Sequence, residues 1–118
     1  MDGENSCTRV LHFGGEAIEL EPDGHLVDPG QWSEALAAEM ARLAGQELGE
    51  LHWWMIRFVR RHWLEYGTPP LMRAVVTAMR SDTGREDASS RTLYRLFPEG
   101  PIREACRFAG LPRPEACI

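Results

Sequence analysis

The chain has 118 residues, 43% of them hydrophobic, and its 18 acidic and 13 basic residues give a formal net charge of −5. This length predicts one globular domain spanning residues 1–118, and no apolar run approaches the ~18 residues that a membrane-spanning helix needs. Residues 1–50 sum to −9 and residues 51–118 to +4, an arginine excess weaker than the basic footprint typical of a nucleic-acid-binding protein.

The N-terminal segment, residues 1–8, is acidic, polar and without periodicity, so we expect it to be disordered. It has neither the basic start nor the apolar stretch of a signal peptide. A reducing cytoplasm is therefore the expected compartment. Cys7 is interpreted as an incidental exposed thiol, because no neighbouring residue would lower its pKa.

A β-hairpin is predicted next. Residues 10–13 and 16–20 are the two strands, joined by the turn Gly14-Gly15. A third short strand is considered at residues 25–27, after a second turn. So small a sheet is not stable alone and must lie on helices.

Five helices are expected after the hairpin. Ser33 is a good N-cap for the first. The second, the longest, is expected to be the central core helix, with Arg57, Arg60 and Arg61 directed outward. Leu71 is expected to point inward from the third, and residues 81–87 to form a polar loop. The helices are predicted over residues 34–45, 50–66, 71–80, 89 or 90 to 97, and 101–109.

The C-terminal stretch combines a short helix with an extended arm. Pro101 at the first helical position and Gly110 just past the end bound the helix. Pro112 and Pro114 then prevent helix continuation. Residues 110–118 are thus predicted to form a flexible arm with Cys117 at the second-last position. The predicted fold class is mainly α (α+β), a compact orthogonal bundle of about five helices with a small N-terminal β-hairpin and this extended C-terminal arm.

Three cysteines, Cys7, Cys106 and Cys117, are too few for a disulfide framework, and their spacing fits no zinc motif. No metal or other cofactor is therefore predicted. Cys106 lies on the last helix, where Ile102, Ala105 and Ala109 share part of its face. The residues alone favour its burial as a small apolar side chain.

Several motifs carry a resemblance to a known family. They are LYRLFPEGP at 93–101, ACRFAGLPRP at 105–114, the terminal CI at 117–118, and earlier matches at 24–26, 31–33, 52–53, 57–60 and 69–70. From about residue 13 onward, the chain resembles the DsrC/TusE/DsvC family of sulfur-relay proteins.

The resemblance implies a sulfurtransferase-type persulfide carrier, which acts as a protein co-substrate rather than as a stand-alone catalyst. It implies that Cys117 accepts a persulfide sulfur and that Cys106 is the resolving thiol, able to close onto Cys117. A nucleophile of this kind must be accessible and partly ionised, and the position of Cys117 near the tip of an arm suits that requirement.

The resemblance also implies partners: a sulfurtransferase complex of the DsrEFH/TusBCD kind, and dissimilatory sulfite reductase. It implies no bound metal or organic cofactor. DsrC-type members resemble this chain in having both cysteines, whereas TusE-type members typically keep only the second-last one. Dissimilatory sulfur metabolism is thus favoured over the relay for tRNA 2-thiouridine synthesis, which stays as the alternative.

Two other classes of function remain open from the residues. A helix-turn-helix-like DNA-binding redox regulator would use Arg91 and Arg95 on the helix that follows the 81–88 turn. Such a regulator would need strongly salt-dependent DNA binding. The remaining class is a subunit that only stabilises a larger complex, for which Cys117 would be dispensable.

Overall fold

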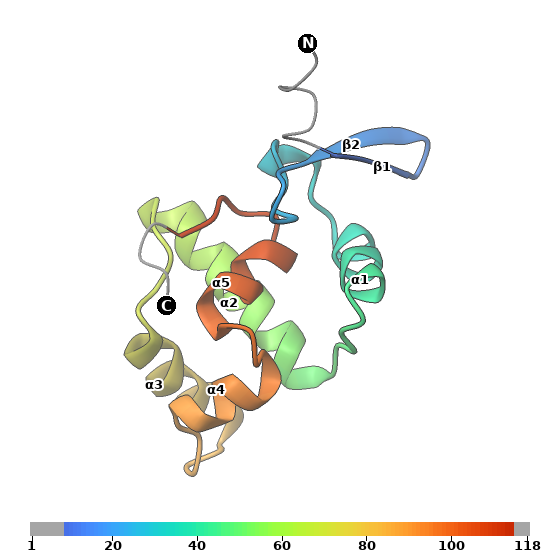
Figure 1. Ribbon diagram of the computed structural model, residues 1–118. Helices are drawn as coiled ribbons and strands as arrows, with labels where there is room; N and C mark the ends of the chain where they lie inside the picture. Colours follow the sequence, from blue (N-terminus) through green and yellow to red (C-terminus); the bar gives the residue numbers. More distant parts are fainter. Residues whose placement is uncertain (1–8, 115–118) are drawn as a thin grey trace.

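A two-stranded antiparallel hairpin begins the part of the chain, residues 9–114, that the computed structural model describes (Figure 1). Strand β1 (Arg9–Phe13) pairs with β2 (Glu16–Leu20), with Leu11 opposite Ile18. Ile18 is the only fully buried side chain of the two strands, and Leu11, Phe13 and Leu20 are partly buried against the core. The third strand considered at residues 25–27 is reduced to a single bridge between Leu20 and Leu26. The expected disorder of residues 1–8 and the role of Cys7 lie outside the described residues.

The connection from the hairpin to the first helix contains a short 3-10 turn, Pro29–Gln31. Helix α1 (Glu34–Leu43) then begins at the predicted cap: the Leu36 backbone amide donates to Ser33 Oγ at 3.0 Å. It ends two residues earlier than predicted, because Gly45 has a positive φ of 75° that breaks the helical path.

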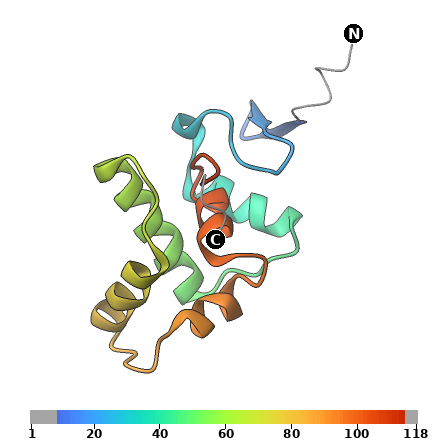
Figure 2. The ribbon, with the colours of Figure 1, turned by 60° about the vertical axis from the view of Figure 1, so that its left-hand side comes forward.

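Helix α2 (Glu50–Tyr66) has the bounds that the sequence predicts and is the longest helix of the described chain. It buries Met55, Ile56 and Val59, and it ends at Gly67 in the left-handed conformation. Figures 1 and 2 show α2 running through the molecule with the C-terminal helix beside it, which agrees with the contact between these two elements. The prediction of a central core helix is confirmed.

Helices α3 (Met72–Thr83) and α4 (Ser90–Leu96) pack against each other at the end of the molecule away from the hairpin (Figure 1). Two details of the prediction were wrong. Leu71 precedes α3 as its N-cap and is 78% exposed rather than inward. The helix also extends into the first three residues of the expected polar loop and ends at Thr83, whose hydroxyl donates to the Met79 carbonyl at 2.7 Å.

Helix α5 (Pro101–Phe108) contacts α1, α2 and α4, and Figure 2 shows it between α1 and α2. Its buried residues, Ile102, Ala105, Cys106 and Phe108, join one core with side chains from every other helix. The predicted class, five helices with an N-terminal hairpin, is confirmed. Within residues 9–114, no helix is both long and apolar enough to cross a membrane.

Candidate functional site

Cys106 lies on the buried face of α5 and is 1% exposed. It is a free thiol, and burial raises its pKa to about 12. Removal from water penalises the charged thiolate far more than the neutral thiol. The burial expected from the residue pattern is therefore confirmed, and Cys106 is a neutral, covered sulfhydryl at physiological pH.

The other predicted thiol, Cys117, lies outside the described residues, as does Cys7. Its role as the sulfur-accepting nucleophile, and its pairing with Cys106, therefore remain predictions. The structure does describe how the chain leaves α5 towards Cys117. The contacts of residues 110–114 show how the arm is attached to the body.

The first turn after α5 is tightly built. The Leu111 amide donates to the Cys106 carbonyl at 3.0 Å, and the Gly110 amide donates to the Arg107 carbonyl at 3.2 Å. Gly110 has a φ of +74°, which favours glycine. A Cβ at this position would lie 2.5 Å from Trp32 Cδ1. Leu111 is fully buried, so the root of the arm packs into the core.

Three side chains from distant parts of the chain bind the carbonyls of this turn. Trp32 Nε1 donates to the Phe108 carbonyl at 2.8 Å, and Arg60 Nη1 donates to the Ala109 carbonyl at 2.8 Å. His25 Nδ1 lies 3.0 Å from the Leu111 carbonyl oxygen, which can only accept, so Nδ1 carries the proton. We call Trp32, Arg60 and His25 the root clamp.

Arg60 differs from its predicted outward position. Its guanidinium lies over the Trp32 ring, 4.3 Å from the ring centroid, and partial burial lowers its pKa. Helical spacing placed Arg60 beside Arg57 and Arg61 on an exposed face, and spacing alone does not show that a later segment covers that face. The available signal was that both Trp32 and Arg60 lie within segments that carry the family resemblance.

Beyond the clamp, the arm continues over the body surface. Pro112 and Arg113 are exposed, whereas Pro114 is buried. Arg113 Nη1 lies 3.4 Å from Asp23 Oδ2. On its other side, the segment lines a largely apolar groove of about 610 Å³. The groove lies between residues 112–114, the end of α2, the turn that precedes α3, and helix α5. Its lining residues are Trp63, Gly67, Thr68, Pro69, Pro70, Leu71, Met72, Ile102, Pro112, Arg113 and Pro114.

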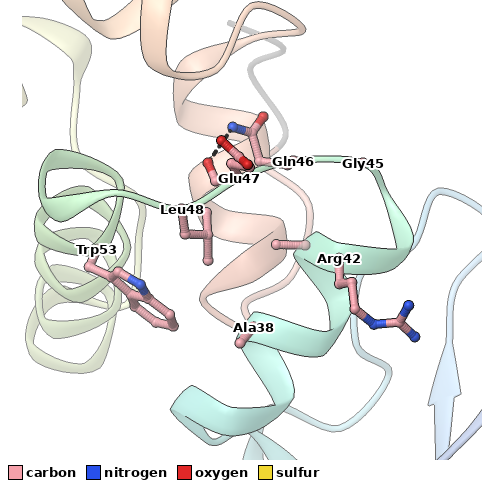
Figure 3. A pocket seen from close by; sticks show the side chains of 8 residues that line it. Ala38, Arg42, Gly45, Gln46, Glu47, Leu48 and Trp53 are labelled. Atoms are coloured by element: carbon pink, nitrogen blue, oxygen red, sulfur yellow. Dashed lines mark hydrogen bonds between the residues drawn. The ribbon is translucent and has the colours of Figure 1, made fainter.

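A separate hollow of about 460 Å³ lies between α1, the loop that follows it and α2 (Figure 3). In this view Leu48 and Trp53 lie near each other on its α2 side, Ala38 lies on α1 and Arg42 points away, and Gln46 donates to the Glu47 carbonyl at 2.9 Å. Its lining includes no cysteine. Among residues 9–114, no group of three side chains could hold a metal ion.

Arg91 and Arg95, the candidate DNA-contacting residues, are both exposed on α4. That helix has seven residues and packs against α3. The regulator hypothesis stays an untested prediction.

Comparison with known proteins covers nearly the whole chain. Residues 12–118 match the family model described as DsrC like protein. The "Sulfurtransferase TusE" of Salmonella typhimurium is 47% identical over 109 residues, which cover 92% of this chain and all of that protein. The name of this relative agrees with the sulfur-relay family that the sequence motifs predict.

Solved structures agree with the family match. The crystal structure of the oxidized gamma-subunit of the dissimilatory sulfite reductase (DsrC) from Archaeoglobus fulgidus is 36% identical, has a TM-score of 0.83, and is covered completely by 93% of this chain. The NMR structure of Allochromatium vinosum DsrC is also 36% identical, with a TM-score of 0.82, and the match covers 94% of this chain and 99% of that one. The chain therefore belongs to the DsrC-like family of sulfur-relay proteins, whose relatives include the sulfurtransferase TusE.

Proposed function

We propose that this protein carries sulfur as a persulfide on Cys117 and delivers it to a partner enzyme. The observation that supports this role is the family match over residues 12–118, which includes the C-terminal arm and its cysteine. A relative of nearly the same length, 47% identical, is named as a sulfurtransferase. Because Cys106 is buried, we assign the sulfur-accepting role to Cys117, the other thiol of the motif.

The transfer step is a thiolate displacement. The Cys117 thiolate attacks the outer sulfur of a donor persulfide, R–S–SH, and a new S–S bond forms as the donor's S–S bond breaks. The donor leaves as the thiolate R–S⁻, and Cys117 becomes Cys117–S–SH. The step needs no oxidant and no metal, and it can be repeated in the opposite sense towards an acceptor.

Cys106 is proposed as the resolving thiol, with a conformational requirement. Loss of the Cys106 proton and attack on the Cys117 sulfur would form a Cys106–Cys117 disulfide and release the carried sulfur as hydrogen sulfide. Because Cys106 is buried with a pKa of about 12, this step requires the end of α5 to open first. The resolving role is thus confined to a state in which the arm's root has been released.

Two sulfur acceptors are supported by different observations. Greater identity with TusE than with the DsrC structures, 47% against 36%, supports the relay to tRNA 2-thiouridine. The presence of both Cys106 and Cys117, and the likeness to a sulfite reductase gamma-subunit, support a relay linked to dissimilatory sulfite reductase. In either relay, the donor would be a sulfurtransferase complex of the TusBCD/DsrEFH kind, and the cytoplasm stays the predicted compartment.

The carrier role is tested by intact mass spectrometry after incubation with a persulfide donor. The wild-type chain should gain one sulfur atom, and Cys117→Ser should not gain it. Cys7→Ser is the matched control and should gain it fully. Sulfur retained by Cys117→Ser would contradict the assignment.

A further inference from the structure

The carbonyls at the end of α5 have an unusual set of partners. The last carbonyls of any helix have no partner within the helix, and water or local turns commonly satisfy them. Here the carbonyls of Phe108 and Ala109 accept from Trp32 and Arg60, which lie 76 and 49 residues earlier in the chain. His25, 86 residues before Leu111, binds the next carbonyl along the turn. Three separate segments therefore meet at one backbone turn.

The polar atoms of all three clamp residues bind backbone carbonyls of the turn. Trp32 and Arg60 are both half-buried and lie at the edge of the body, while His25 is 1% exposed and closes the inner side. The Arg60 guanidinium stacks on the Trp32 ring, and Trp32 contacts the Cα side of Gly110 so closely that no larger residue fits. Arg60 and Trp32 thus restrict each other, while His25 holds the next carbonyl of the turn.

The direction of that path follows from the next residues. Leu111 is anchored in the core, and residues 112–114 line the groove beside the end of α2 and the turn before α3. Cys117 lies three residues beyond Pro114, a reach of at most roughly 10 Å at ~3.3 Å per residue. Because this separation is short, the place where Cys117 can be presented depends mainly on how residues 108–111 are held.

We propose that Trp32, Arg60 and His25 are positioning residues for sulfur transfer, which hold the Phe108–Leu111 turn so that the arm meets a protein partner from one direction. This inference rests on the proposed function of Cys117. A root held in advance loses less conformational entropy when the arm enters a partner's cleft. If the turn loses these hydrogen bonds, the arm becomes more flexible at its base and docking weakens, while the chemistry of the thiol is unchanged.

The test compares a small donor with a protein donor. Glutathione persulfide reaches Cys117 without docking, whereas a persulfide-loaded sulfurtransferase complex of the TusBCD kind must dock on the arm. Trp32→Phe and Arg60→Met each remove one hydrogen bond donated to the turn. We expect KM for the protein donor to rise about tenfold in each variant, because that factor corresponds to the loss of one such hydrogen bond. The maximal rate, and the rate with glutathione persulfide, should stay at the wild-type value.

Matched controls come from α2. Arg61→Met removes an exposed arginine next in sequence on α2, and Trp53→Phe removes an indole N–H elsewhere on that helix; both should retain the wild-type KM. Arg60→Lys restores a positive donor without the planar stack and should recover part of the lost affinity. Hydrogen exchange adds a structural measurement: the Leu111 amide should exchange faster in Trp32→Phe and Arg60→Met, while the Val59 amide in the core stays protected.

The outcomes separate this inference from the proposed function. If the wild-type chain takes no sulfur on Cys117 from either donor, the carrier function itself is wrong. If the wild-type chain carries sulfur but Trp32→Phe and Arg60→Met keep the wild-type KM for the protein donor, the positioning role is overturned. An equal loss with both donors, together with exposure of the Val59 amide, also overturns it and leaves the clamp a purely stabilising feature.

Discussion

The thiol of Cys106 is kept neutral by burial, and this determines what it can do. Burial raises its pKa from 9.0 to about 12, which lowers the thiolate fraction near neutral pH by about a thousandfold. In a Cys7→Ser, Cys117→Ser background, we expect iodoacetamide to label Cys106 very slowly in the native protein and rapidly in denaturant. Mass spectrometry of the alkylated chain measures both rates. Fast native labelling would show that the end of α5 opens readily.

The same shift makes stability depend on alkaline pH. The unfolded thiol ionises above pH 9.0, whereas the folded thiol stays protonated up to about pH 12. Stability from the neutral thiol is therefore fully present below pH 9 and is lost as pH rises through that window. The predicted slope is about −1.4 kcal/mol per pH unit in the free energy of unfolding. Urea denaturation of wild type and Cys106→Ala from pH 8 to pH 11 measures it, and Cys106→Ala should lack this contribution to the slope.

Gly110 combines two demands that, among the described glycines, only Gly24 beside Arg107 shares. Gly110 has a positive φ, and a Cβ there would overlap the Trp32 side chain. We expect Gly110→Ala to lower the free energy of unfolding by about 3 kcal/mol, from backbone strain and displacement of Trp32. Gly84→Ala is the control, because Gly84 has a similar φ of +72° and open space around its Cα. It should cost only about 1 kcal/mol, and equal costs at the two sites would contradict the steric argument.

At the scale of elements, local rules predicted most of the helices. The bounds of α2 follow from a 3.6-residue apolar repeat that Gly67 ends, and Ser33 caps α1 as expected. Leu71 was misplaced because a cap residue lies before the first helical turn, so helical periodicity does not apply to it. Arg60 was misplaced because its partner carbonyl belongs to Ala109, 49 residues away. Local pattern contains no information about contacts of that range.

The cap of α1 can be tested directly. Ser33 Oγ accepts the Leu36 amide at 3.0 Å, and Ser33→Ala should lower stability by about 1 kcal/mol because that amide loses its partner. Ser81→Ala is the control, since Ser81 lies exposed within α3. Thermal denaturation of both variants measures the difference. A Ser33→Ala protein as stable as Ser81→Ala would show that water replaces the cap at no cost.

For the whole molecule, burial of Cys106 was predictable from its helical face, but the clamp around the arm's root was not. The reason is that His25, Trp32 and Arg60 meet only in the folded chain. The sequence resemblance pointed to the right family, and the comparisons extend that family to residues 12–118.

Removing the gene from cells tests which acceptor is served. If the chain supplies tRNA thiolation, the deletion strain should lose most 2-thiouridine, measured by mass spectrometry of digested tRNA. Wild-type chain should restore it and Cys117→Ser should not, while Cys7→Ser serves as the complementation control. Unchanged 2-thiouridine would contradict this acceptor and support the relay linked to sulfite reductase.

The contacts that hold the end of α5 are made to main-chain oxygens, which every amino acid possesses. The body selects side chains only at the root itself, where Phe108, Ala109 and Leu111 are buried and Gly110 lies against Trp32. One body can accordingly accept tips of different composition. If the residues after Pro114 are exchanged between relatives, the hybrid proteins should fold, and their choice of partner enzyme should follow the exchanged residues. Substitution in this short segment would then redirect the carried sulfur to another partner.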